Sequence, residues 1–282
     1  MTEEPPWGDA LGGYVRRPGL QRHDTTPDDV VASRVQDTTP DETVAATHVR
    51  WDASRIDFER IQPSSVDRAL FRFEQSLPDL VWNAAALEGN TFTLPEVRTL
   101  LDGVTIGGKK IEEEEQVLAL AEGYTRVDDL VRRGAFALTK SVSDDLHGRV
   151  ARHEAIESGA FHGEGSVGGG GTVRLASGGS VEGVPQALLQ ERFQRIVDFL
   201  DSLRDPRERA FGYFAAATRS QFYFDGNKRT ARLMMSGVLM AGGYESVNIP
   251  FARQFEFNKA LDTLFSTDDA TPIMAFIADC AG

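Results

Sequence analysis

The sequence of 282 residues has one cysteine, Cys280, and only five histidines. A single cysteine excludes a disulfide within the chain, and no Cys and His set shows the spacing of zinc ligands. The first residues lack the basic and apolar regions of a secretory signal. The longest apolar stretch, LMMSGVLMAGGY, is too short for the ~30 Å of hydrocarbon in a bilayer. We therefore expect a soluble cytoplasmic protein with no membrane contact.

Basic residues are also scarce. The chain has 30 Lys and Arg against 43 Asp and Glu, which gives a formal net charge of -13 and a pI near 4.9. Binding to the phosphate backbone of nucleic acids relies on clustered Lys and Arg, so this composition argues against a general nucleic-acid binder. It leaves room for a small anion bound by one local basic cluster. A hydrophobic content of 41% is ordinary for a soluble globular core.

The first fifty residues, 1–50, are polar and contain a near repeat, DTTPDDVVASRV from Asp24 and DTTPDETVAATHV from Asp37. Each copy places a threonine before a proline and acidic residues, which favours a helix N-cap and a first helical proline. A short helix could follow each copy, but two copies are too few for a solenoid. We expect residues 1–50 to be a flexible or partly helical extension.

Apolar residues recur at helical spacing from about Trp51 onward. In the stretch that ends at Gly89, a residue typical of a helix C-terminus, Pro78 is expected to bend a helix or to separate two helices. Thr93 and Glu96 stand at capping-box spacing at the start of another helix. Further helices are expected in KKIEEEEQVLALAEGYTRVDDLVRR, KSVSDDLHGRVARHEA, ALLQERFQRIVDFLDSL, PRERAFGYFAAATRS, residues 227–241, and two more in residues 251–280.

Residues 159–186 break this helical pattern because glycines are dense there. The segment TVRLA, Thr172 to Ala176, predicts a short strand, and ASGGS after it predicts a turn. The four glycines 168–171 are not a P-loop, because no GKS or GKT follows them. The sequence therefore predicts a mainly α fold with one small β-hairpin.

The stretch SQFYFDGNKRTARLMM, residues 220–235, concentrates positive charge at one helix start. Its turn sequence, residues 225–227, leads into a helix whose first turns carry Lys228, Arg229 and Arg232. Free backbone N–H groups and two guanidinium groups on the same side predict a site for a polyphosphate. The simplest alternative is an ordinary helix N-terminus with a solvated basic face.

Residues 221–232, QFYFDGNKRTAR, resemble the signature of the Fic/Doc (Fido) family, HxFx(D/E)GNxRxxR. A second motif upstream, AAALEGN, resembles the (S/T)xxxE(G/N) sequence of Fic proteins with an N-terminal inhibitory helix. The resemblance covers about residues 55–280. The residues that match the first motif are Asp225, Gly226, Asn227, Arg229 and Arg232, and those that match the second are Glu88, Gly89 and Asn90.

The resemblance implies a Fic-type helical bundle with a β-hairpin flap and a reaction that transfers AMP from ATP to a protein hydroxyl. Asp225 would hold Mg²⁺, which commonly uses one or two carboxylates together with phosphate oxygens. The flap at residues 172–176 would pair with the target segment. Glu88, followed by Gly89, would reach Arg232 and inhibit the enzyme. The implied nucleotide-binding residues are Gly226, Asn227, Lys228, Arg229 and Arg232.

The same resemblance divides the chain into three parts. Residues 1–50 would be the extension, residues 51–125 a helical region with the inhibitory helix, and residues 126–282 the Fic core domain. The implied partners are ATP and a target protein whose identity the sequence does not give. A homodimer is also compatible with it.

The sequence departs from the family pattern at the catalytic position. Gln221 stands where the family has its catalytic histidine, and an amide cannot take a proton from an attacking hydroxyl. Loss of a general base costs ~10²- to 10⁴-fold in rate. The nearest histidine upstream is His162. Lys228 resembles the NKR variant of the Doc branch, which goes with phosphate transfer, and Ala84 replaces the Ser or Thr of the inhibitory motif.

Three interpretations remain open at this point. The chain is an attenuated ATP-dependent transferase of AMP or phosphate, a non-catalytic nucleotide-binding Fic module that regulates a partner, or an interaction scaffold without nucleotide binding. The intact residues Asn227, Arg229 and Arg232 argue against the scaffold.

Overall fold

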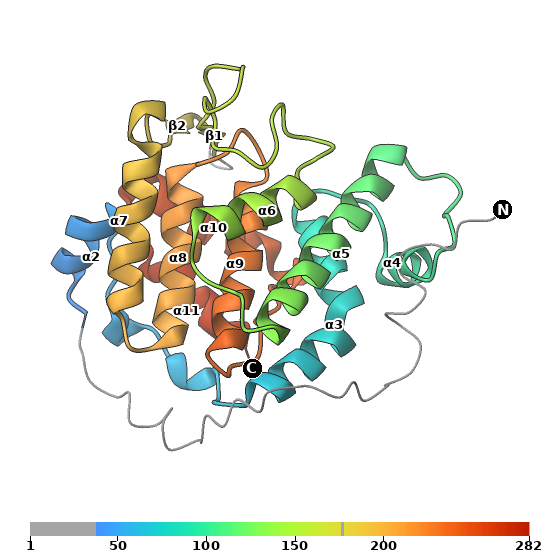
Figure 1. The fold of residues 1–282 in the computed structure, drawn as a ribbon, viewed down its shortest axis with the longest axis horizontal. Helices are drawn as coiled ribbons and strands as arrows, with labels where there is room; N and C mark the ends of the chain where they lie inside the picture. The colour runs from blue at the N-terminus through green and yellow to red at the C-terminus, as the bar shows by residue number, and fades with distance from the viewer. Residues whose placement is uncertain (1–37, 176–177, 282) are drawn as a thin grey trace.

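The computed structural model describes residues 38–175 and 178–281, which form a mostly helical fold (Figure 1). The first DTTP copy and Ala176 lie outside the described residues. The helices are α2 (Pro40–Thr47), α3 (Val66–Leu87), α4 (Leu94–Leu101), α5 (Ile111–Arg132), α6 (Lys140–Val150), α7 (Leu189–Ser202), α8 (Pro206–Ser220), α9 (Asn227–Ala241), α10 (Gln254–Thr267) and α11 (Thr271–Asp279). Short 3₁₀ turns lie at Ala53–Arg55, Phe58–Arg60, Gln186–Leu188 and Phe251–Arg253, and the strands are β1 (Thr172–Arg174) and β2 (Ser180–Glu182).

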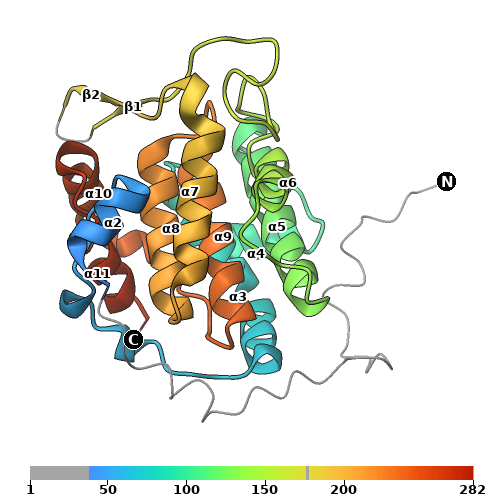
Figure 2. The same cartoon turned by 60° about the vertical axis from the view of Figure 1, so that its left-hand side comes forward.

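Helix α9 runs through the centre of the bundle (Figures 1 and 2). Helices α3, α5, α6 and α8 all pack against it. Its residues are buried on every face from Arg229 to Met240, as expected for a helix with apolar residues all round. A residue in its first turn is therefore positioned by several neighbouring helices at once.

Capping residues set the start of two helices, as the sequence predicts. In α2, the Glu42 side chain accepts from the backbone N–H of Thr39 at 2.9 Å, and in α4, Glu96 accepts from the backbone N–H of Thr93 at 2.7 Å. Helix α2 begins at Pro40 of the second DTTP copy, so the short helix that could follow this copy is present. It packs against α7.

Helix α3 is a single helix of 22 residues with Pro78 inside it. The expected separation into two helices at this proline is therefore wrong. A proline inside a helix costs about 3 kcal/mol or more, but buried residues on both sides of it, among them Phe73 and Leu80, join the same core. Packing thus keeps the helix continuous and places Glu88 at its C-cap.

Helix α6 ends at Val150, earlier than the expected segment KSVSDDLHGRVARHEA. Residues 151–157 form turns instead. Ala151 is fully buried in this turn, and the chain then changes direction, so that Glu154 faces α9. The apolar spacing does not predict this change of direction, because Ala151 would be buried in a continued helix and is also buried in the turn.

The glycine-rich segment forms the predicted hairpin. Strands β1 and β2 pair antiparallel, with Thr172 opposite Glu182 and Val173 opposite Val181. Below the hairpin, the backbone N–H of Val184 donates to the carbonyl of Ser220 at 2.9 Å. The hairpin is thus tied to the end of α8, and Figure 2 shows it at one end of the bundle.

One contiguous hydrophobic core runs from Val49 to Ala278. The first and last described parts of the chain meet beside it: the N–H of Arg50 donates to the carbonyl of Asp268 at 2.8 Å, and the N–H of Ala270 donates to the carbonyl of Arg50 at 2.7 Å. Within the described ranges, none of the helices combines the length and the apolar character needed to cross a bilayer.

Candidate functional site

Two residues in the left-handed region bound the loop between α8 and α9. Gln221 caps the C-terminus of α8 with φ 54°, and Gly226 caps the N-terminus of α9 with φ 73°. A Cβ at Gly226 would lie 2.8 Å from the Cβ of Ala151. Glycine is therefore required at this position both by its conformation and by the close approach of the turn after α6.

Asn227 holds this loop in shape from the first position of α9. Its Oδ1 accepts from the backbone N–H of Tyr223 at 2.9 Å, and its Nδ2 donates to the carbonyl of Tyr223 at 2.8 Å and to Oε1 of Gln221 at 3.2 Å. The side chain is 8% exposed. Its hydrogen bonds are thus used inside the loop, so its role in this structure is to position the loop.

His147 supports the loop from α6, and sequence analysis missed it. Its Nδ1 accepts from the backbone N–H of Gly159 at 2.9 Å, so Nε2 carries the proton and donates to the carbonyl of Asp225 at 2.8 Å. The ring stacks on Tyr223 with 3.7 Å between centroids. Burial lowers the pKa of His147 from 6.5 to about 4, which keeps the ring neutral. No local sequence pattern indicates this role.

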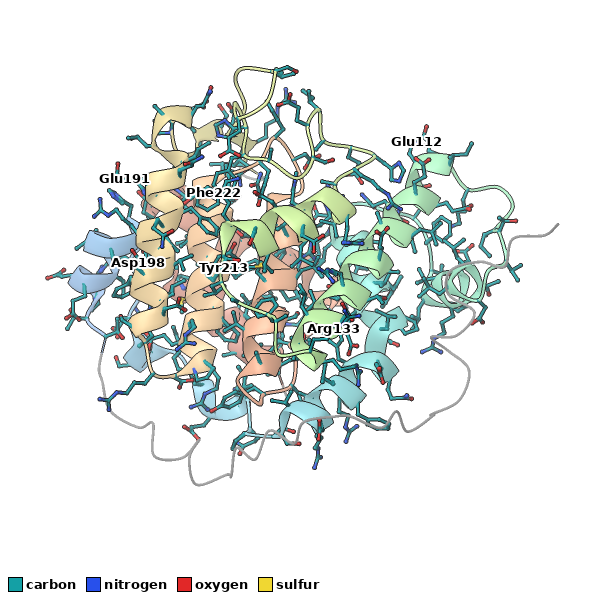
Figure 3. All side chains as sticks on the ribbon, viewed as in Figure 1. Glu112, Arg133, Glu191, Asp198, Tyr213 and Phe222 are labelled. Carbon is teal, nitrogen blue, oxygen red and sulfur yellow. The ribbon has the colours of Figure 1, made fainter. Side chains whose placement is uncertain are left out.

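Tyr223 and Phe222 anchor the loop in the core. The Tyr223 hydroxyl lies 2.7 Å from Oγ of Ser143 and donates to Oδ1 of Asp144 at 2.9 Å. The hydroxyl of Tyr213 donates to the same serine at 3.3 Å. Phe222 and Tyr213 both lie among the helices in Figure 3, and Phe222 is 1% exposed. These contacts hold Phe222 and Tyr223, and with them the turn that precedes α9, in a fixed position.

The Gln221 amide is turned inward. Its Nε2 donates to the carbonyl of Thr218 at 2.6 Å, and its Oε1 accepts from Asn227. The residue is 6% exposed. Both ends of the amide therefore have protein partners, and neither end can act as a base.

His162 lies beside this loop, although it is 59 residues upstream of Gln221. Its backbone N–H donates to the carbonyl of Phe222 at 2.9 Å. Its ring is buried beneath the glycines before β1, where a Cβ at Gly171 would lie 3.0 Å from Nε2. Burial lowers the pKa of His162. The structure thus brings this histidine to the base of the hairpin, while the Gln221 amide is bonded to Thr218 and Asn227.

The N-terminus of α9 has no side-chain cap, and the first backbone N–H groups of a helix have no intrahelical partner. Asp225 precedes it with its side chain 60% exposed, and its Oδ1 accepts from the N–H of Gly226 at 2.5 Å. Within the described ranges, no three His, Cys, Asp or Glu side chains are grouped to hold a metal ion. One exposed carboxylate at a helix N-terminus is compatible with Mg²⁺, which commonly takes one or two carboxylates and completes its ligand set with water or phosphate oxygens.

Glu88 occupies the basic site from the end of α3. Its Oε1 lies 2.5 Å from Nη2 of Arg232, and its Oε2 lies 3.0 Å from Nζ of Lys228. Burial raises the pKa of Glu88, but the charges of Lys228, Arg232 and Arg229 lower it more, so the net shift is downward. Glu88 is therefore ionised and paired with two cations. Gly89 follows it with φ 91° and ends the helix.

Arg229 is held by a different carboxylate, Glu154, which sequence analysis missed. Its Nη2 lies 2.6 Å from Oε2 of Glu154 and 3.5 Å from Oδ1 of Asp225. The expectation that Arg229 and Arg232 face one shared anion therefore differs from the structure, in which each has its own carboxylate. Glu154 lies in the turns after α6, and its spacing from the motif gives no signal in the sequence.

The comparisons with known proteins agree on one fold. No protein-family model matches the chain. Among solved structures, a segment of Fic-1 from C. elegans has a TM-score of 0.63 at 23% identity and covers 86% of this chain and 69% of its own. A Fic domain containing signaling protein from Bacteroides thetaiotaomicron has a TM-score of 0.63 at 20% identity, covering 81% and 90%. The chain has a Fic-type helical fold.

The sequence relatives support the Fic domain family as well. A protein adenylyltransferase Fic from Drosophila persimilis is 33% identical over 208 residues, which are 71% of this chain and 38% of the relative. The Drosophila ananassae protein of the same name is 32% identical and is covered to 39%. The chain thus spans well under half the length of these Fic relatives. The expected mainly α Fic bundle with a small hairpin is confirmed.

Proposed function

We propose that this chain is a Fic-domain nucleotide-binding protein that transfers AMP, or phosphate, from ATP to a protein hydroxyl, and that Glu88 keeps it inhibited. The observation that carries the proposal is the pairing of the Glu88 carboxylate with Lys228 and Arg232 at the start of α9. A carboxylate in that position competes with an anionic ligand for the same two cations. The resemblance to Fic proteins with an N-terminal inhibitory helix implies the same role for this carboxylate.

The residues around α9 fit a triphosphate once Glu88 is displaced. The backbone N–H groups after Gly226 bind phosphate oxygens at a helix N-terminus. Lys228 supplies charge from the first turn of α9 and Arg232 from the second, and Asn227 keeps the loop in shape. Asp225 would hold Mg²⁺, which supplies positive charge next to the phosphates when bound.

The hairpin and the chain division belong to the same proposal. Strand β1 (Thr172–Arg174) is short and carries two exposed residues, which suits pairing with an extended segment of a target protein. Residues 51–125 would be the inhibitory region and residues 126–282 the Fic core. We also propose that the protein acts in the cytoplasm, forms a homodimer and modifies a protein target. Nucleic acid is not a proposed partner, because the net charge is -13.

A second function is favoured by the Gln221 amide, which is bonded at both ends to Thr218 and Asn227. A side chain fixed inward and unable to accept a proton suits a nucleotide-binding module that regulates a partner without catalysis. The two functions share the binding site. They differ only in whether a bound nucleotide reacts.

Incubation with ATP labelled at the α- or the γ-phosphate tests both functions. We expect the Glu88→Gly variant to transfer α-label to protein, and the Glu88→Gly, Gln221→His double variant to do so ~10²- to 10⁴-fold faster. Transfer of γ-label instead would assign phosphate transfer. The matched control is Glu112→Gln, an exposed carboxylate at the start of α5 (Figure 3). Binding of ATP without any transfer by Glu88→Gly would assign the non-catalytic module, and absence of ATP binding in calorimetry would overturn the nucleotide site.

A further inference from the structure

Arg229 is the most enclosed cation of the motif. Its side chain is 3% exposed. Its Nη1 donates to the carbonyl of Val150 at 3.0 Å and to Oε1 of Glu154 at 2.8 Å, while its Nη2 lies 2.6 Å from Oε2 of Glu154. Two parallel N–H···O bonds of this kind form the strongest geometry available to an arginine and a carboxylate. Arg229 is therefore already bound to an anion, and that anion comes from the protein.

The electrostatics agree with the contacts. Burial lowers the pKa of Arg229, but the hydrogen bond and charge of Glu154 raise it more, so the net shift is upward. A buried guanidinium without a partner destabilises the fold, because no attraction to an anion offsets the free energy lost when it leaves water. Any ligand that takes Glu154 away from Arg229 must therefore bring its own negative charge to the same place.

Glu154 is also linked to the segment that carries Glu88. Its Oε1 accepts from Nε2 of Gln116 at 3.0 Å, and Oε1 of Gln116 accepts from Nδ2 of Asn90 at 2.9 Å. Asn90 comes two residues after Glu88. Glu88, at the end of α3, and Glu154, in the turns after α6, therefore belong to two segments that are joined by hydrogen bonds through Gln116.

Resting on the proposed nucleotide site, we propose that Glu154 is a second inhibitory carboxylate and that it makes the site selective for ligands with at least two phosphate groups. Glu88 neutralises Lys228 and Arg232, and Glu154 neutralises Arg229. A single phosphate can replace only one of the two carboxylates, and the other carboxylate stays paired with its cation. A di- or triphosphate presents negative charge at successive phosphates and can replace both carboxylates.

Calorimetry with inorganic tripolyphosphate and with orthophosphate, each in the presence of Mg²⁺, tests this inference. The variants are Glu154→Gln, Glu88→Gln and the double variant. The control is Glu191→Gln, which removes an exposed carboxylate that pairs with Arg195 on α7. We expect each single variant to bind tripolyphosphate about tenfold more tightly, and the double variant to show about the product of the two effects. For orthophosphate, the double variant should gain no more than the better single variant.

The outcomes separate this inference from the function on which it rests. If Glu88→Gln binds tripolyphosphate more tightly while Glu154→Gln equals the wild type or binds more weakly, Glu154 only supports Arg229 and the second inhibitory carboxylate is rejected. If the double variant binds neither ligand, the nucleotide site itself is rejected. An orthophosphate gain in the double variant equal to that for tripolyphosphate would overturn the selectivity.

A second variant decides the question if Glu154→Gln does not fold. Gln116→Ala leaves both Glu154 and Arg229 in place and removes the hydrogen bonds that Gln116 makes to Glu154 and to Asn90, of which only the first holds Glu154. We expect tripolyphosphate affinity to rise about twofold to fivefold, in proportion to one hydrogen bond. An unchanged affinity in a folded Gln116→Ala protein would overturn the role of Glu154. Thermal unfolding of each variant shows which proteins are folded.

Discussion

The Glu88 carboxylate lies 2.5 Å from the Arg232 guanidinium and so joins the C-terminus of α3 to α9 across 144 residues of sequence. The same carboxylate contacts Lys228 at 3.0 Å. The contact to which we assign inhibition is thus also a tertiary contact between two long helices. Stability and ligand affinity are consequently expected to change in opposite directions when it is removed.

The Glu88→Gln variant is expected to lose about 3 kcal/mol of unfolding free energy, because two partly buried cations lose their partner. Tripolyphosphate should restore part of this loss, so the ligand-induced rise in Tm should be larger in the variant than in the wild type. Thermal unfolding with and without tripolyphosphate measures both. Glu112→Gln is the control and should change neither value. A variant as stable as the wild type, with the same ligand shift, would contradict a coupled pair.

His147 is expected to make stability fall in acid. Its pKa is lowered from 6.5 to about 4 by burial, so between these values the unfolded chain takes up a proton that the folded protein does not. Unfolding free energy is therefore retained above pH 6.5 and lost as the pH falls toward 4, by up to about 3 kcal/mol. Urea denaturation of wild type and His147→Gln at several pH values isolates this contribution. The stability difference between the two proteins should shrink by that amount, and a constant difference would argue against a neutral buried imidazole.

Gly226→Ala is expected to destabilise the protein by about 1–3 kcal/mol, because the residue has φ 73° and its new Cβ would lie 2.8 Å from that of Ala151. The turn into α9 should shift, so tripolyphosphate binding in a Glu88→Gln background should also weaken. Gly107→Ala is the matched control, since nothing lies within 4 Å of its Cβ and its φ is not positive. Equal effects of the two substitutions in denaturation and calorimetry would contradict the role given to Gly226.

Tyr223→Phe is expected to cost about 1–3 kcal/mol, because Ser143 and Asp144 lose a buried hydroxyl partner. Tyr244→Phe, at another core tyrosine outside this network, serves as the comparison. If the Tyr223 hydroxyl positions the loop, the Tyr223 variant should bind tripolyphosphate more weakly in a Glu88→Gln background while Tyr244→Phe binds normally. Loss of stability with unchanged binding would limit Tyr223 to a packing role.

Local chemistry explains the parts of the fold that the sequence predicts well. Helix α9 begins at Asn227 as expected, because the turn at residues 225–227 stops one helix and starts another. Capping boxes place α2 and α4 for the same reason. The prediction at Pro78 is wrong, because the helix-breaking effect of proline is a local property, whereas the burial that offsets it involves residues from the rest of the core.

The arrangement of the site depends on long-range contacts that no local pattern reports. The resemblance to Fic proteins predicts the meeting of Glu88 and Arg232, and the structure shows the two side chains in contact. Glu154 is 75 residues from Arg229, and nothing in its surroundings marks it as a partner. The roles of His147 and of the inward Gln221 amide likewise follow only from positions that several helices fix together.

Backbone hydrogen bonds join Arg50 to residues 268–270. The amide hydrogens of Arg50 and Ala270 are therefore expected to exchange with solvent when these two segments separate from each other. Arg50 and Ala270 should therefore report one opening free energy, although 220 positions separate them along the chain. The segment around Arg50 and the turn before α11 are thus expected to behave in exchange as one unit, and release of the first would expose the second in the same step.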